Sequence, residues 1–316
     1  MTTILEPPLL HKVDFLNHRK ITWQKVKRAR YLFYQRFHYA YPGAIRSLRH
    51  RLVVVPAARY GDQQLCDNQV RVSPDAVTAH NRLDEFGNRI LEFEAPEIRR
   101  EVTFEALTEV ERVGRGNPPL MKSVDTELYL EPTPLTQPDA KLRATTKMLQ
   151  AEAKDERDLA NAINRWVHGA MRYGFGATGI STSAAQALEA GEGLCQDYAH
   201  IMLALCRAAD LRARYVSGHM LAEGGTHAWV EVLLEDVRGF HAFAFDPTNN
   251  RRPGLSYVTV AVGRDYRDVA PTSGSYQAPF SGELTATKRA GLTAVEYDDG
   301  QVIGDRTRFG SSLPRQ

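Results

Sequence analysis

The sequence predicts an α+β protein with two structured regions, an all-β sandwich followed by a core of helices and strands. Short β-rich segments separated by turn residues fill residues 31–130. The stretch from Glu131 to Pro138 then holds three prolines in eight residues, which indicates a linker or domain boundary. After it, apolar residues recur at helical spacing, and strands follow up to about residue 250.

Composition excludes several classes of protein. The 316 residues are 43% hydrophobic and 25% charged, as in soluble globular proteins that bury a core. A formal net charge of +2 gives no general reason to expect nucleic-acid binding. No stretch reaches the ~18 apolar residues that would cross a membrane. Pro7 and Pro8 interrupt any signal-type apolar run, so we expect a cytoplasmic protein.

The first part of the chain is basic. Residues 1–51 carry eleven Lys or Arg and two acids, and we treat residues 1–30 as a basic N-terminal segment. A solvated basic face explains this bias, and a docking surface for an acidic partner is the alternative.

The region 31–130 is predicted to be the β-sandwich, because its strand-length segments recur between turn signals. The segments are Arg49–Val55, Val70–Val72 and Arg89–Phe93, with turn signals at 41–43, 73–75 and 86–88.

The region 140–250 is predicted to be the α+β core. One predicted helix has an apolar face, formed by Leu159, Ile163, Trp166, Val167, Ala170 and Met171. Ser183 and Gln186 form a capping box that opens a short helix, which Gly191 closes. A longer helix runs from Cys195 to about Ala209, a stretch without Gly or Pro.

Three strands are predicted to follow this helix. They span Ala213–Ser217, His227–Leu234 and Phe240–Phe245. We expect residues 251–316 to form a β-rich C-terminal extension of the core.

Cys195 is the candidate nucleophile. It follows Gly191 and Gly193 at the predicted start of a helix, where free N–H groups and the helix dipole favour an anion. Such a site raises the fraction of thiolate. A buried, inert core cysteine is the alternative for any free thiol. The other two cysteines are Cys66 and Cys206, and an odd count of three does not indicate a disulfide scaffold.

His227 and Asp246 supply the other groups that thiol catalysis needs. His227 begins a predicted strand and can act as general base and acid toward a facing cysteine. Asp246 ends the next strand, where a carboxylate can orient the imidazole and stabilise its charged form. A structural histidine and an ordinary Asp-Pro turn are the alternatives.

The sequence predicts neither a metal nor another cofactor. Cys195 and Cys206 would lie ~16 Å apart along one helix, too far to share an ion. There is no CxxC pair, no HExxH motif and no Gly-rich phosphate loop.

Four motifs around these residues resemble the bacterial transglutaminase-like superfamily. They are Gly193–His200, Ala213–Gly218, Thr226–Glu231 and Asp246–Asn249, with Cys195, His227 and Asp246 spaced 32 and 19 positions apart. Residues 30–120 resemble the β-rich region that precedes this core in bacteria, and Gly263–Pro271 resembles the segment after it. His219 departs from the pattern, since an aromatic residue is expected there.

The resemblance implies a papain-like transglutaminase core and a catalytic triad of Cys195, His227 and Asp246. It implies acyl transfer at an amide bond through a thioester, with the Cys195 N–H in the oxyanion hole. We expect hydrolysis of a peptide or isopeptide bond, as in a transglutaminase-like cysteine peptidase or amidase. A true protein-glutamine transglutaminase and a non-catalytic peptide-binding module are the alternatives.

Two further expectations concern the partners of the protein and the position of Trp229. We expect a peptide or protein substrate. Relatives of this family are often encoded beside ATP-grasp ligases, and that resemblance suggests a small-peptide substrate and, as one option, a pathway shared with such a ligase. Trp229 shares a strand face with His227, so it either walls an amine channel or packs against the Cys195 helix.

Overall fold

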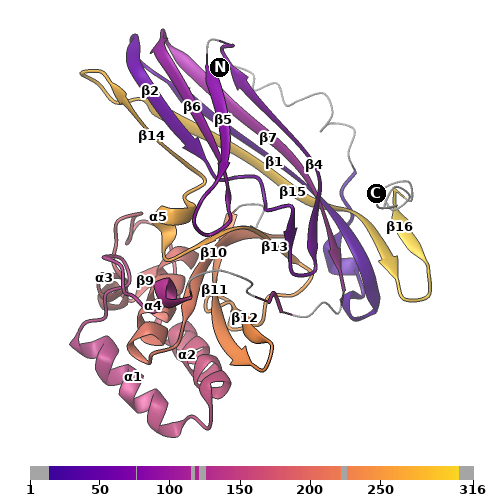
Figure 1. The fold of residues 1–316 in the computed structure, drawn as a ribbon, viewed down its shortest axis with the longest axis vertical. Coiled ribbons are helices and arrows are strands. Elements are labelled where there is room, and N and C mark those ends of the chain that lie inside the picture. The colour runs from indigo at the N-terminus through magenta and orange to yellow at the C-terminus, as the bar shows by residue number, and fades with distance from the viewer. Residues whose placement is uncertain (1–13, 76, 115–117, 121–125, 222–225, 306–316) are drawn as a thin grey trace.

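A computed structural model describes residues 14–75, 77–114, 118–120, 126–221 and 226–305 of the protein. The β-sandwich and the α+β core form two lobes, and the α-helices belong to the core lobe, which lies below the sandwich in the view (Figure 1). The predicted α+β class with a β-rich N-terminal region is confirmed. Residues 1–13 of the basic segment lie outside the described residues.

Two sheets form the sandwich. Strand orders are β16-β15-β1-β7-β4-β3 in one and β14-β2-β6-β5 in the other. Large apolar side chains from both sheets, including Phe37, Leu48, Phe93 and Phe104, form one buried cluster between them. The strands are β1 (Val26–Ala40), β2 (Ile45–Leu52), β3 (Arg59–Tyr60), β4 (Gln63–Ser73), β5 (Thr78–Leu83), β6 (Arg89–Ile98), β7 (Glu101–Val113), β14 (Thr272–Gln277), β15 (Glu283–Tyr297) and β16 (Val302–Gly304).

The prediction that residues 251–316 extend the core is wrong for most of that segment. Among the described residues of the segment, only the strand β13 (Tyr257–Gly263) joins the core sheet. The strand β14 pairs with β2, and β15 pairs along β1 from Ala40↔Glu283 to Val26↔Tyr297. These strands therefore complete the sandwich. The sequence did not reveal this, because their partners lie more than two hundred positions earlier and such pairing leaves no local pattern.

The core is a four-stranded sheet of order β12-β11-β10-β13, with helices packed on one face. Ala228, Val230 and Val232 of β11 share a buried cluster with α4, whose residues from Asp197 to Arg207 are all buried. The elements are α1 (Ala140–Glu152), α2 (Glu156–Ala170), β8 (Arg172–Tyr173), α3 (Ala184–Ala190), β9 (Glu192–Gly193), α4 (Cys195–Ala208), β10 (Ala213–Met220), β11 (Thr226–Asp236), β12 (Gly239–Phe245) and α5 (Tyr266–Val269); short 3-10 turns span His18–Lys20, Trp23–Lys25 and Glu127–Tyr129.

Local predictions in the core are confirmed. The Ser183 hydroxyl and the Gln186 side chain form a capping box at α3. Gly191 ends α3 with a φ of 66°, a left-handed conformation that glycine adopts without strain. The longer helix begins at Cys195, as the motif predicts.

The proline-rich stretch between the lobes is tied to the core. Arg207, buried in α4, donates to the carbonyl of Tyr129 at 3.2 Å and to the hydroxyl of Thr136 at 2.5 Å. The Arg207 guanidinium also donates to the carbonyls of Ala213 and Arg264. Burial lowers the pKa of Arg207 to about 10. The stretch is therefore anchored to the core by the Arg207 side chain.

Two amide side chains of the sandwich lobe fasten it to the core sheet. Gln63 donates to the Thr259 carbonyl at 2.7 Å and accepts from the Thr259 N–H at 2.9 Å. Asn88 makes the equivalent pair with Val262, at 2.7 and 2.9 Å. Both contacts satisfy backbone groups of β13, an edge strand whose outer side would otherwise lack partners.

Most basic residues of β1 and β2 pair with carboxylates on neighbouring strands or turns. Arg30, for example, lies 2.8 Å from Glu111. The further pairs are Lys27 and Arg28 with Glu296, Arg36 with Glu105, Arg49 with Glu94 and Arg51 with Asp84. Much of the basic charge is thus balanced within the sandwich lobe. Over the described residues, no helix combines the length and the apolar character that a membrane crossing needs.

Candidate active site

Cys195 is the first residue of α4 and is partly exposed. The earliest bonds of the helix are donated by Asp197 and Tyr198 to the Leu194 carbonyl, at 2.9 and 3.3 Å. The N–H groups of Cys195 and Gln196 precede these bonds, so they lie at the open positive end of the helix. The predicted position of the thiol at a helix N-terminus is therefore observed.

A carboxylate holds the turn that leads to Cys195. Asp197 is fully buried and accepts from the Leu194 N–H and the Thr178 hydroxyl, both at 2.7 Å. Burial raises the pKa of Asp197, and these hydrogen bonds oppose the rise. Gly193 is required here, because a Cβ at this position would lie 2.6 Å from the Asp197 carboxylate.

His227 and Asp246 form a buried pair on adjacent strands. His227 Nε2 lies 2.9 Å from Asp246 Oδ2, and neither side chain has exposed surface. His227 stands at the start of β11, and Asp246 follows the last residue of β12, so strand pairing brings them together.

Three further residues hold the Asp246 carboxylate. Its Oδ2 accepts from the Tyr257 hydroxyl at 2.6 Å and from Asn249 Nδ2 at 2.8 Å. Its Oδ1 accepts from the backbone N–H groups of Thr248 and Asn249, at 3.0 and 3.1 Å. Burial raises the pKa of Asp246, but the hydrogen bonds from His227, Tyr257 and Asn249 outweigh it and hold the pKa below its ordinary value.

A cleft of about 610 Å³ contains both Cys195 and His227 in its lining. The first residues of α4 and of β11 therefore meet at this cleft. Within the part of the chain that the structure describes, no hydrogen bond joins the Cys195 thiol directly to His227. Catalytic hydrogen bonds are often long without substrate and shorten when it binds, so this geometry is compatible with a thiol–imidazole pair.

The sandwich lobe supplies one wall of the cleft. Phe37 of β1, together with Leu284, Ala286 and Lys288 of β15, lines it beside Cys195. Aromatic residues of the core complete the lining, and Phe175 at 79% exposure is the most open of them. This wall was not predicted from the sequence, because β15 follows the core in the chain and was expected to extend it, whereas it pairs with β1.

Trp229 takes neither of the two predicted positions. Its indole packs edge-on against Tyr257 at 5.5 Å and belongs to a cluster with Val216 and Met220. The helix α4 packs on the opposite face of the sheet, through the alternate residues of β11. His219, where an aromatic residue was expected, stacks on Phe33 at 4.4 Å between ring centroids.

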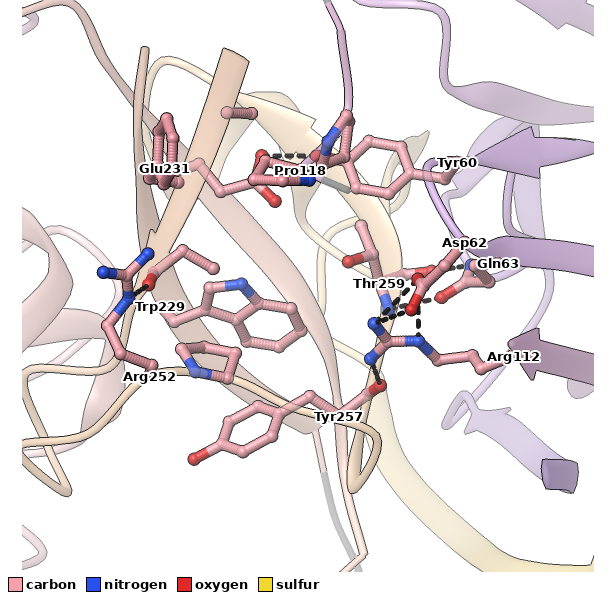
Figure 2. A pocket seen from close by; sticks show the side chains of 15 residues that line it. Tyr60, Asp62, Gln63, Arg112, Pro118, Trp229, Glu231, Arg252, Tyr257 and Thr259 are labelled. Carbon is pink, nitrogen blue, oxygen red and sulfur yellow. Dashed lines mark hydrogen bonds and ion pairs between the residues drawn. The ribbon is translucent and has the colours of Figure 1, made fainter. Parts of the chain in front are cut away.

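A second cavity, of about 170 Å³, lies between the lobes, and Trp229 and Tyr257 are among the residues that line it (Figure 2). Neither Cys195 nor His227 lines it. Arg112 binds both carboxylate oxygens of Asp62 at 2.8 and 2.9 Å, and Figure 2 shows this contact at the cavity wall. Glu231 is similarly engaged by Arg214 at 2.7 Å. The cavity is a polar seam between the lobes, and the described residues that line it include no cysteine.

The remaining cysteines have different environments. Cys206 is fully buried in α4, and burial raises its pKa to about 12. Cys66 is exposed on β4, and partial burial of its sulfur raises its pKa. In the residues that the structure covers, no group of three or more His, Cys, Asp or Glu side chains is placed to hold a metal ion.

Two family models match the chain. Residues 143–247 match the transglutaminase-like superfamily, and residues 31–111 match the bacterial transglutaminase-like N-terminal region. An uncharacterized protein of Mycobacterium leprae is 31% identical over 240 residues, which cover 69% of this chain and 82% of that protein. An uncharacterized protein of Mycobacterium tuberculosis H37Rv is 38% identical over 130 residues, covering 37% of this chain and 40% of that protein.

The chain shares its fold with a solved structure. It is that of a candidate cysteine protease from Cytophaga hutchinsonii, with a TM-score of 0.65 and 19% identity, covering 85% of this chain and 99% of that one. The fold and its relatives define a cysteine-dependent enzyme family with a papain-like α+β core. The chain belongs to the transglutaminase-like superfamily, and it carries the bacterial N-terminal region of that superfamily.

Proposed function

We propose that the protein is a thiol hydrolase that cleaves a peptide or isopeptide bond, with Cys195 as nucleophile, His227 as base and acid, and Asp246 as the residue that orients His227. The observation that carries this proposal is the buried His227–Asp246 pair beside the cleft that contains the Cys195 thiol. A buried carboxylate is costly to maintain without partners, and one that holds an imidazole beside a cleft with a thiol is the arrangement that thiol catalysis uses.

The proposed first step is acylation. Since Asp246 binds Nε2 of His227, Nδ1 is the nitrogen that takes the thiol proton. The thiolate attacks the amide carbonyl carbon, and the oxyanion that forms lies near the N–H groups at the start of α4. The C–N bond then breaks as His227 gives its proton to the leaving nitrogen, which departs as an amine and leaves a thioester on Cys195.

The proposed second step is hydrolysis. His227 takes a proton from water, and the hydroxyl attacks the thioester carbonyl. The C–S bond breaks, the acid product leaves, and the proton returns to the thiolate of Cys195. No oxidant, reductant or cofactor enters this balance.

The dimensions and lining of the cleft favour a peptide. A volume of about 610 Å³ lies within the range of ligand-binding pockets. Its aromatic residues, Tyr173 and Phe175 among them, offer apolar surface along which a short peptide can lie.

The test uses the full chain, Cys195→Ala as control, a peptide library and an excess of a fluorescent primary amine. Intact mass after acid quench should show an acyl adduct on Cys195, with free amine released and no label incorporated. Label incorporation that outpaces hydrolysis would identify a true transglutaminase. Peptide binding without an adduct or turnover would contradict an enzymatic role altogether.

A further inference from the structure

A lysine side chain lines the cleft that contains Cys195. Lys288 is the only Lys, Arg, Asp or Glu among the described residues that line it. It lies on the same face of β15 as Leu284 and Ala286, which also line the cleft, because alternate residues of a strand share a face. Its half-buried side chain comes from the sandwich lobe, whereas Cys195 comes from the core.

Lys288 lies close to the reacting groups. Its Nζ donates to the hydroxyl of Thr226 at 3.2 Å, and Thr226 directly precedes His227. Burial lowers the pKa of Lys288, while the neighbouring Cys195 raises it, so the ammonium and the thiol are within electrostatic reach of each other.

The ammonium has no counter-ion among the described residues. The ion pairs of the structure do not include Lys288, and its one hydrogen-bond partner is a neutral hydroxyl. Gln35, directly opposite Lys288 on β1, is neutral as well. A cation removed from water without a partner is unfavourable, and a carboxylate that enters the cleft would offset that cost by a charge-assisted hydrogen bond.

We propose that Lys288 selects substrates that carry a carboxylate close to the scissile amide. This inference rests on the proposed thioester chemistry at Cys195 and names the class of substrate for it, an anionic peptide. The carboxylate has two possible sources, an acidic side chain next to the bond or a free main-chain carboxylate, and the same contact with Lys288 serves both.

A pair of small reagents tests the charge effect without knowledge of the substrate. Iodoacetate and iodoacetamide alkylate the same thiol and differ mainly in the charge beside the reacting carbon. Lys288→Gln should lower the ratio of the iodoacetate rate to the iodoacetamide rate at Cys195 by about fivefold. Arg289→Gln is the matched control, since Arg289 is the next residue and lies over the ring of Phe15, at 5.7 Å from its centroid.

The reagent pair also separates recognition from activation of the thiol. If Lys288 acts only by stabilising the thiolate, Lys288→Gln will slow both reagents equally and leave the ratio unchanged, which overturns the proposal. An equal change of the ratio in Arg289→Gln would indicate a diffuse field and would overturn it too. Absence of an acyl adduct on Cys195 in the earlier test is a separate result, which concerns the proposed function.

Protection of Cys195 from iodoacetamide identifies the source of the carboxylate. The probes are acetyl-Ala-Glu-Ala-amide, acetyl-Ala-Gln-Ala-amide and acetyl-Ala-Gln-Ala with a free carboxylate. An acidic side chain predicts that the first protects several-fold better than the second, and a main-chain carboxylate predicts this of the third. Both advantages should vanish in Lys288→Gln. Equal protection by all three peptides would contradict a role for Lys288 in recognition.

Discussion

His227 Nε2 and Asp246 Oδ2 lie 2.9 Å apart between side chains that have no exposed surface. Tyr257 and Asn249 also donate to Asp246, so the orientation of the carboxylate is determined before any substrate binds. An ionised carboxylate only accepts, and Nε2 must therefore carry a proton in this contact. The pair holds the imidazole in one tautomer, with Nδ1 as its basic nitrogen when His227 is neutral.

Replacing Asp246 by Asn should lower turnover far more than it changes KM. The Asn amide can donate to Nε2, which favours the tautomer with its proton on Nδ1, so the base toward Cys195 is lost. We expect kcat to fall by about 10³- to 10⁴-fold in steady-state assays. Tyr257→Phe removes only one of the donors to Asp246 and should cost far less. An unchanged kcat in Asp246→Asn would make Asp246 a structural residue.

The stability that Asp246 contributes should depend on pH. Its folded pKa lies below the ordinary value of about 3.9, so the unfolded state binds the proton more readily. The contribution is therefore complete above pH ~4 and is lost as the pH falls through the folded pKa. Urea midpoints measured between pH 6 and pH 2.5 should show the gap between wild type and Asp246→Asn closing toward the acid end. A gap that does not change with pH would contradict this linkage.

Cys195 should be the one hyper-reactive thiol. Cys206 is buried with its pKa raised to about 12, and Cys66 also has a raised pKa and does not lie at a helix N-terminus. Iodoacetamide at mildly acidic pH should label Cys195 first, as peptide mapping by mass spectrometry would show. Labelling of Cys66 at the same rate would rule out activation of Cys195 by its site.

Replacing Cys195 by Ala should abolish activity and preserve the fold. Cys195 is partly exposed at the cleft, so the loss of its sulfur leaves no closed cavity. We expect Tm to change by no more than about 3 °C. Leu203→Ala, on the fully buried part of α4, provides the contrast and should cost about 2–5 kcal/mol. A large drop in Tm for Cys195→Ala would identify Cys195 as a core residue.

Gln63 should stabilise the contact between the lobes. It exchanges two hydrogen bonds with Thr259 and is 2% exposed, so Gln63→Ala leaves two backbone groups of β13 without partners. We expect a loss of about 1–3 kcal/mol in the free energy of unfolding. Gln64 is adjacent and exposed, and Gln64→Ala should stay within about 0.5 kcal/mol of wild type. Equal effects of the two changes would exclude a role for the amide contact.

The sequence by itself determined the local structure around the candidate site. The Gly193–Leu194–Cys195 turn, the capping box at Ser183 and the start of β11 follow from residues a few positions apart, because helix caps and strand patterns are short-range effects. The order of Cys195, His227 and Asp246 also carried the resemblance to the superfamily. The roles of these three residues remain predictions.

Only the tertiary structure decided which distant segments meet at the cleft. Asn249 belongs to a motif visible in the sequence, but Tyr257 and Lys288 have no local signal, and neither does the pairing of β15 with β1. Strand pairing joins residues far apart in the chain through uniform backbone hydrogen bonds, and register depends on which faces become buried. Short-range patterns therefore located the thiol, and the long-range return of the C-terminal strand placed a lysine beside it.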